Sequence, residues 1–185
     1  SRYLGSSFET YVLTWRWSEY IPMPWPAPLR SHVLALTYSG GISGGDKHSL
    51  FFLGGYPPQN LLQSIYDFSR PGSASLRGYA YASVVGDQFH VLNAEYRFPI
   101  AWIEHGPYKT FPLYLRRLHG VVFADYGGAF NGGFSFDKLK LGVGGELILE
   151  LTYAYYFDAA LQLGYARGVD KGGGNQIYFL LNSPF

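Results

Sequence analysis

The sequence has no cysteine, little charge and no long apolar run, and each absence argues against a class of protein. Without cysteine, a disulfide framework and a thiolate metal site are both excluded. Only 15% of the residues are charged and the formal net charge is +1, so the basic surface of a nucleic-acid-binding protein is missing. No apolar run approaches the ~18 residues of a membrane helix, which argues against a helical membrane protein.

Aromatic residues and glycine are abundant instead. Aromatics make up 19% of the chain and there are 24 glycines, a balance that favours many short strands over helices. A chain of 185 residues is long enough for one domain with a sizeable core. We therefore predict a single all-β domain over residues 1–185.

Alternation of apolar and polar side chains is the main structural signal. In residues 138–151, Lys, Gly and Glu alternate with Leu and Val, and residues 89–98, 157–167 and 176–182 show similar patterns. Strict alternation is typical of a strand with two different faces. The pattern predicts about seven strands, near residues 8–20, 31–40, 88–99, 118–128, 138–151, 155–167 and 175–183.

Strand length favours a membrane barrel over a soluble sandwich. Most of the expected strands have about 10–13 residues, close to the ~9–11 of a tilted transmembrane strand and longer than the ~5–6 of soluble sheets. The fold predicted is an antiparallel transmembrane β-barrel with an apolar outer face. In the alternative, a soluble sandwich, the apolar face would be the core.

Aromatic residues and the last strand support the barrel. Tyr and Trp gather near the expected strand ends, where membrane headgroups favour rings with a polar tip; ordinary core aromatics are the alternative. These residues are Trp15, Trp17, Tyr20, Trp25, Tyr96, Trp102, Tyr153, Tyr155 and Tyr156. The final alternating segment, with Ile177, Phe179, Leu181 and the terminal Phe185, resembles the signal by which bacterial outer-membrane barrels are delivered for insertion.

The connections give an orientation if the last strand ends in the periplasm. Segments 41–87, 129–137 and 168–174 then lie outside the cell, and segments 21–30, 100–117 and 152–154 lie in the periplasm. The longest loop, 41–87, is external, as is usual for such barrels. Counting seven strands back places Ser1 outside, where no complete bacterial barrel begins. Either residues 48–55 form an eighth strand or strands are missing upstream, and we expect missing upstream strands.

Several short motifs, in this order, carry a family resemblance. They are FFLGG (51–55), LRGY (76–79), NAEYRFPI (93–100), FADYGGAF (123–130), LGVGGELILEL (141–151), LGYARG (163–168) and a final Phe. The series resembles the C-terminal part of the barrel in the BamA-like (bacterial surface antigen) superfamily of outer-membrane assembly factors and translocators. The resemblance covers nearly the whole chain from Ser31.

The resemblance implies a loop lock inside the barrel. The tip of the long loop, Arg77, Gly78 and Tyr79, would fold back into the lumen, where Arg77 would pair with Glu95 and Asp125 on the two strands that follow. Alternation independently places Glu95 on the lumen face, and a planar guanidinium suits a carboxylate partner. The alternative is a surface arginine in a mobile loop.

A loop tip in the lumen needs a wide wall. Eight strands enclose only enough room for side chains. Upstream strands, or a second copy of the chain in a homo-oligomer, would therefore complete the wall, and the resemblance implies a barrel of roughly 16 strands.

The resemblance also implies a function. It predicts a non-enzymatic protein of the Gram-negative bacterial outer membrane that inserts or translocates other outer-membrane polypeptides. Its partners would be outer-membrane lipids and client polypeptides, with no cofactor and no nucleic acid. Strand 175–183 would form one side of a seam that admits a client strand. The alternative is a small structural or passive-pore barrel without this activity.

Other candidate sites carry weak signals. The five histidines, His32, His48, His90, His105 and His119, show no close metal-ligand spacing, so no metal site is expected. A lipid-hydrolysing site built from Ser83, Asp87 and His90 would need a base adjacent to the nucleophile, which nothing in the sequence indicates. The triple glycine at 172–174 predicts an external turn, and the four prolines in residues 20–28 predict a periplasmic connection.

Overall fold

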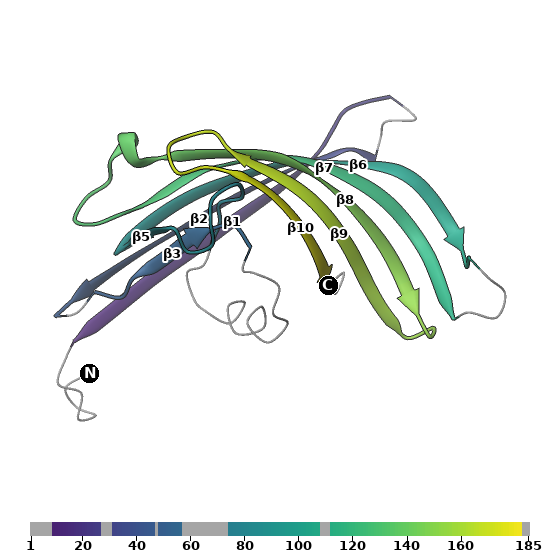
Figure 1. Cartoon of the computed structure of the whole chain (residues 1–185), viewed down its shortest axis with the longest axis horizontal. Helices are drawn as coiled ribbons and strands as arrows, with labels where there is room; N and C mark the ends of the chain where they lie inside the picture. Colours follow the sequence, from purple (N-terminus) through teal and green to yellow (C-terminus); the bar gives the residue numbers. More distant parts are fainter. Residues whose placement is uncertain (1–8, 27–30, 47, 57–73, 108–111, 183–185) are drawn as a thin grey trace.

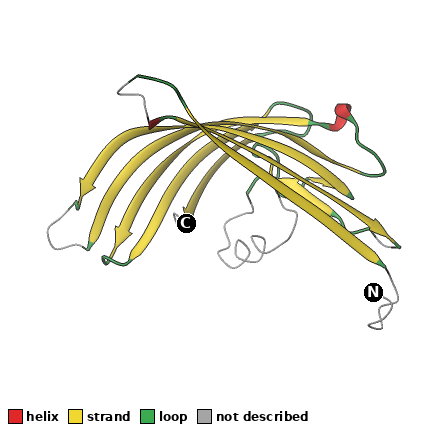
Figure 2. Cartoon of the chain, turned by 180° about the vertical axis from the view of Figure 1, so that it is seen from behind, coloured by secondary structure: helices red, strands yellow, loops and turns green. Residues whose placement is uncertain are grey.

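The structure is a computed structural model that describes residues 9–26, 31–46, 48–56, 74–107 and 112–182. Seven strands form one antiparallel sheet in the order β1-β2-β6-β7-β8-β9-β10. They are β1 (Thr10–Pro22), β2 (Val33–Gly45), β6 (Gln88–His105), β7 (Leu113–Phe130), β8 (Lys140–Tyr153), β9 (Phe157–Gly168) and β10 (Asn175–Asn182). The sheet curves into an open arch, the form of part of a barrel wall (Figures 1 and 2). The predicted all-β antiparallel fold is confirmed.

A small second sheet lies under the concave face of the arch (Figure 1). It consists of β3 (Phe51–Gly54), which is parallel to β4 (Ala74–Ser75) and antiparallel to β5 (Val84–Gly86). Residues 48–55 thus supply β3, which belongs to this sheet and not to the wall. A short 3-10 helix, η3 (Phe136–Lys138), lies between β7 and β8. Across the described residues, no helix combines the length and apolarity needed to cross a membrane.

The two faces of the wall follow the predicted alternation. On β8 the Glu146 side chain points to the concave side and is 6% exposed, whereas its neighbour Leu147 on the convex side is 47% exposed. On β10, Tyr178 is buried and Ile177 is exposed. The convex face is therefore the apolar one that a bilayer can cover, and the concave face carries the polar groups.

The concave face and the small sheet share a hydrophobic core. Side chains of the loop and the small sheet pack on side chains of β6 and β7. The loop and small sheet contribute Phe51, Leu53, Leu76, Tyr79 and Val84, and the wall contributes Phe89, Val91 and Ala129. At ~25 cal/mol per Å² of apolar surface, burying several such side chains helps to offset the entropy of ordering a long loop. The loop tip is thereby brought onto the wall.

The expected connection at residues 100–117 is wrong. β6 continues to His105 and β7 already begins at Leu113, so most of this segment is strand. Register shifts between Pro99 and Ala101, between Trp102 and His105, and between Leu115 and Arg117 interrupt the pairing. A β-bulge adds an unpaired residue and breaks the period of two, which is why alternation did not reveal these strand ends.

The expected end of the second strand at residue 40 is also too early. β2 continues for five further residues, from Gly41 to Gly45, which shortens the loop that follows it. A Cβ at Gly40 would overlap the Trp15 ring, and one at Gly44 would overlap the Tyr11 ring. Aromatic side chains from β1 thus cover the glycines of β2, and this cross-strand packing lets a glycine-rich segment remain in a sheet.

Candidate functional site

Arg77 lies at the loop tip between β4 and β5 and reaches the concave face of the wall. Its side chain is 3% exposed. The next residue, Gly78, has φ +89°, and a Cβ there would overlap the backbone of Arg167 and Gly168. Only glycine combines this conformation with so close an approach of the loop to β9. The turn at Gly78 therefore sets the position from which Arg77 extends.

Asp125 of β7 is the main partner of Arg77. The Asp125 carboxylate accepts hydrogen bonds from Nε and Nη2 of Arg77, both at 2.7 Å, and from the Arg77 backbone N–H at 3.0 Å. Asn93, its cross-strand neighbour on β6, donates to the same carboxylate at 2.8 Å. Asp125 is 0% exposed, so four donors replace the water that the charge has lost.

Two further carboxylates complete the surroundings of the guanidinium. Nη1 of Arg77 donates to Oε1 of Glu146 on β8 at 2.9 Å, and Nη2 lies 3.0 Å from Oε1 of Glu95 on β6. The Phe123 ring lies under the guanidinium, 3.5 Å from its centre. We call Arg77, Glu95, Asp125 and Glu146 the arginine cluster.

The arginine cluster contains three acids around one buried cation. Arg97 balances part of the excess negative charge, because its Nη2 donates a hydrogen bond to the second carboxylate oxygen of Glu95 at 2.7 Å. Burial by itself lowers the pKa of Arg77, but its hydrogen bond to Asp125 and the nearby negative charges outweigh burial and hold that pKa above its ordinary value. Arg77 thus stays charged, and its charge is what allows the acids to lie together.

A glycine in the wall makes room for the loop. Gly142 of β8 lies directly opposite Asp125 in the sheet. A Cβ at Gly142 would overlap the carbonyl oxygen of Arg77. Beside it, the Tyr79 hydroxyl donates to the carbonyl oxygen of Leu141 at 2.9 Å and accepts from the N–H of Asp170 at 3.1 Å. Backbone as well as side chains therefore join the loop tip to β8 and to the turn between β9 and β10.

The structure places the residues predicted from sequence as follows. Arg77, Glu95 and Asp125 meet in one cluster, and Gly78 and Tyr79 flank it. On the last strand the outward side chains are exposed and apolar, namely Ile177, Phe179 and Leu181. Phe185 lies outside the described residues. The roles of these groups, as a loop lock and as an assembly signal with a seam strand, remain predictions.

Sequence reasoning did not assign Glu146 to the site. The alternation in residues 138–151 already places Glu146 on the polar face, so a signal for it existed. The resemblance, however, indicated only two acids, on the two strands that follow the loop. Asn93 and Phe123 were missed in the same way, although both belong to the concave face of their strands.

The weaker candidate sites do not assemble in the structure. His90 shares a hydrogen bond of 2.8 Å with the Tyr38 hydroxyl, and Asp87 lies 3.3 Å from His48, so a triad of Ser83, Asp87 and His90 is not formed. Within the described ranges, no group of three or more His, Asp or Glu side chains could hold a metal ion.

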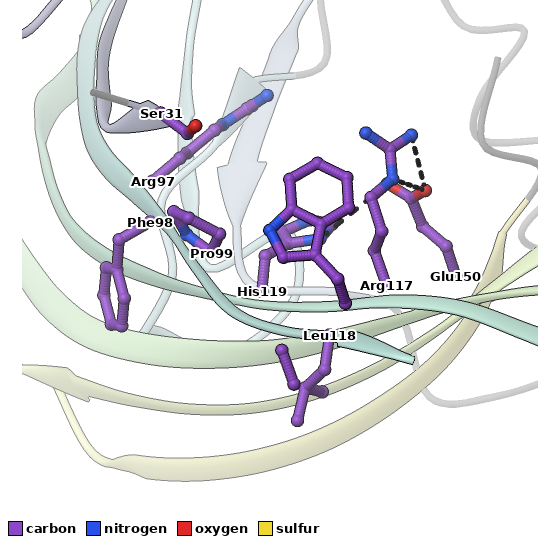
Figure 3. Close-up of a pocket in the computed structure, with 10 residues that line it drawn as sticks. Ser31, Arg97, Phe98, Pro99, Arg117, Leu118, His119 and Glu150 are labelled. Carbon is purple, nitrogen blue, oxygen red and sulfur yellow. Dashed lines mark hydrogen bonds and ion pairs between the residues drawn. The ribbon is translucent and has the colours of Figure 1, made fainter. Parts of the chain in front are cut away.

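A small pocket of about 170 Å³ lies between the C-terminal part of β6 and the N-terminal part of β7 (Figure 3). Nε and Nη2 of Arg117 donate to Oε2 of Glu150 at 3.0 and 2.9 Å, and the two side chains face each other in Figure 3. Leu118 points away to the other side of the sheet. Arg97 pairs with Glu95, and His119 lies near Glu150. The charged side chains that line the pocket therefore already have partners, and they do not indicate a ligand.

One comparison with known proteins gives a match. The family model described as the Omp85 superfamily domain matches residues 1–178. No match was found among curated proteins or among solved structures.

Proposed function

Because the chain belongs to the Omp85 superfamily, we propose that it takes part in the insertion or translocation of outer-membrane polypeptides. Members of this superfamily are outer-membrane proteins, and they act as insertases or transporters and not as enzymes. The observation that carries the proposal is the family match over residues 1–178. The proposed location is the outer membrane of a Gram-negative bacterium.

The position of β10 at the end of the described sheet supports a seam that receives client strands. In the described sheet β10 pairs with β9 on one side and is the last strand of the order. Among the described strands none pairs with its other side, where a client strand could join by β-augmentation. The outward side chains Ile177, Phe179 and Leu181 continue the apolar convex face, so the edge stands at the lipid boundary.

The covered concave face supports this function over a passive pore. A passive pore requires an open lumen along the wall. Here the small sheet packs against β6 and β7, and the loop tip crosses to β8. The wall must also be wider than these seven strands to enclose the loop, because small barrels have room only for side chains.

We propose that the arginine cluster acts as the loop lock. Arg77 joins the external loop to three neighbouring wall strands, β6, β7 and β8, through Glu95, Asp125 and Glu146. Its function would be to keep the loop in the lumen and the wall in register while the edge strand exchanges partners. The acids have no other buried cation in the cluster, so loss of Arg77 would disrupt all three contacts together.

Deletion in the natural host tests the function. Levels of other outer-membrane barrels, measured by quantitative mass spectrometry of the outer-membrane fraction, should fall and should recover with the wild-type gene. Complementation with Arg77→Glu should fail, whereas Arg117→Gln, which alters a half-exposed ion pair, should restore the levels. Unchanged levels of every other outer-membrane protein after deletion would refute the insertase and translocator role. Altered lipid A or phospholipid profiles with normal protein levels would instead indicate an enzyme.

A further inference from the structure

The loop tip contacts the edge strand β10 as well as the arginine cluster. The side-chain amide of Gln176 accepts a hydrogen bond from the N–H of Gly78 at 3.1 Å and donates one to the carbonyl oxygen of Tyr79 at 2.8 Å. One side chain on β10 thus satisfies one donor and one acceptor of the loop backbone. A methylene chain of the same length could satisfy neither.

Tyr178 joins β10 to the same loop through Glu146. Its hydroxyl donates to Oε1 of Glu146 at 2.5 Å, and that oxygen also accepts from Nη1 of Arg77 at 2.9 Å. The Tyr178 ring lies over Gly164 of β9, where a Cβ would overlap it. The Tyr56 ring of the external loop packs on Tyr178, with 4.8 Å between ring centroids. Burial raises the pKa of Tyr56 to about 12, so this ring adds no negative charge beside Glu146.

Backbone contacts extend the connection to the turn before β10. The N–H of Gly174 donates to the carbonyl oxygen of Gly78 at 2.9 Å, and Tyr79 forms a β-bridge with Gly173. The loop tip therefore holds the beginning of β10 from the concave side, while β9 holds it along one edge. A strand held in this way cannot roll or separate from β9 without breaking contacts to the loop.

We propose that Gln176 and Tyr178 are positioning residues through which the loop tip clamps β10, so that release of the β10 edge and withdrawal of Arg77 from its cluster are one coupled movement. Edge strands are the part of a sheet that opens most readily, and a clamp from the lumen side restrains that opening. The clamp deepens the proposed function, because it rests on β10 being the edge that receives client strands. The coupling itself is a property of the folded chain and can be measured without a client.

Hydrogen exchange of the full-length protein in lipid bilayers tests the clamp. Gln176→Met retains length and removes both hydrogen bonds to the loop, and Tyr178→Phe removes only the hydroxyl. Both should speed amide exchange in the loop tip and in β10 together, by about fivefold for each lost hydrogen bond. Tyr165→Phe is the matched control, because it removes a hydrogen bond to Asn175 on the convex face without touching the loop. It should leave exchange in the loop tip unchanged.

The reciprocal experiment changes only the loop. Arg77→Lys keeps the charge and loses the fork of donors to Asp125, and it should speed exchange in β10 as well as in the loop tip. If exchange in β10 stays at its wild-type rate in Arg77→Lys, or if Gln176→Met speeds exchange in β10 and leaves the loop tip unchanged, the clamp is refuted. Should Gln176→Met not fold, Gln176→Glu replaces the amide donor with an acceptor and takes its place.

The two proposals can fail separately. If the protein inserts no clients but exchange rises together in the loop tip and β10, the clamp stands and the assigned function is wrong. If client insertion depends on the protein but the exchange rates of the two segments change independently, the function stands and the clamp is wrong.

Discussion

Asp125→Asn removes one charge from the arginine cluster while keeping the shape of the side chain. The two carboxylate oxygens of Asp125 together accept four hydrogen bonds, three from Arg77 and one from Asn93. An asparagine has one oxygen and one NH₂ group in the same positions. In either orientation, therefore, the NH₂ group faces two donors, and Arg77 loses its closest counter-charge.

The expected cost can be ranked from burial. Breaking a buried ion pair by removing one partner costs about 3–5 kcal/mol, and Asp125 is 0% exposed. Glu95 is 19% exposed and also pairs with Arg97, so Glu95→Gln should cost no more than about 1 kcal/mol. Glu146→Gln should fall between them, because that side chain is buried but has a single contact with Arg77.

Unfolding in urea measures this ranking. The protein is folded into lipid vesicles, and unfolding is followed by the fluorescence of its four tryptophans and by the electrophoretic mobility of the folded form. The double variant Arg77→Met with Asp125→Asn should lose less free energy of unfolding than the two single losses added together, because each single change leaves an uncompensated charge.

Two results would refute the assignment of Asp125 as the main partner. The first is a loss below about 1 kcal/mol for Asp125→Asn, the size expected of an exposed pair. The second is a loss for Glu95→Gln equal to or larger than that for Asp125→Asn. Additive losses in the double variant would further show that Arg77 and Asp125 do not interact.

Three further predictions concern the wall and the loop. Gly142→Ala should keep the loop tip from packing on β8 and should lower the unfolding free energy by ~3 kcal/mol, because its Cβ would overlap the Arg77 carbonyl oxygen. Gly174→Ala, with open space at its Cβ, should lower it much less. Equal urea midpoints for the two variants would contradict this reasoning. Arg77→Glu should impair folding, and adding Glu95→Arg should partly restore the folded fraction on gels; no rescue would count against their pairing. Arg117→Gln should lower the unfolding free energy by at most about 1 kcal/mol, because its ion pair is half-exposed, and a larger loss would show a structural role for the pocket beside it.

The faces of the strands could be predicted from the sequence, but the ends of β6 and β7 at their connection could not. Alternation alone assigns Glu146 and Tyr178 to the concave side, since a shift of one residue would turn every apolar side chain inward. At Pro99 and beyond, bulges change which residue faces which side, and Glu104 takes a positive φ of 51°. A pattern with period two has no means of following a strand through such irregularities.

The membership of the arginine cluster depended on register, which no pattern along one strand can supply. Asp125 pairs with Gly142, and Val121 pairs with Glu146, so Glu146 lies four residues along β8 from Gly142, where the loop approaches this strand. The resemblance predicted Glu95 and Asp125 because each lies in one of the short motifs that match the family, NAEYRFPI (93–100) and FADYGGAF (123–130). To assign Glu146 to the cluster, the register of β7 against β8 must be known. That register is set by the hydrogen-bond pairing in the folded sheet.

The direction of the strands limits how the wall can be completed. All six pairings in the seven-stranded sheet are antiparallel, so β1 and β10, its first and last strands, run in the same direction. A second copy in the same membrane orientation would meet β10 with a parallel β1 at both seams. An odd number of further alternating strands, whose first and last members both run antiparallel to β1 and β10, restores alternate directions and leaves no unpaired edge in the bilayer. By the same reasoning, a client strand that joins β10 in the usual pattern must run in the direction of β9.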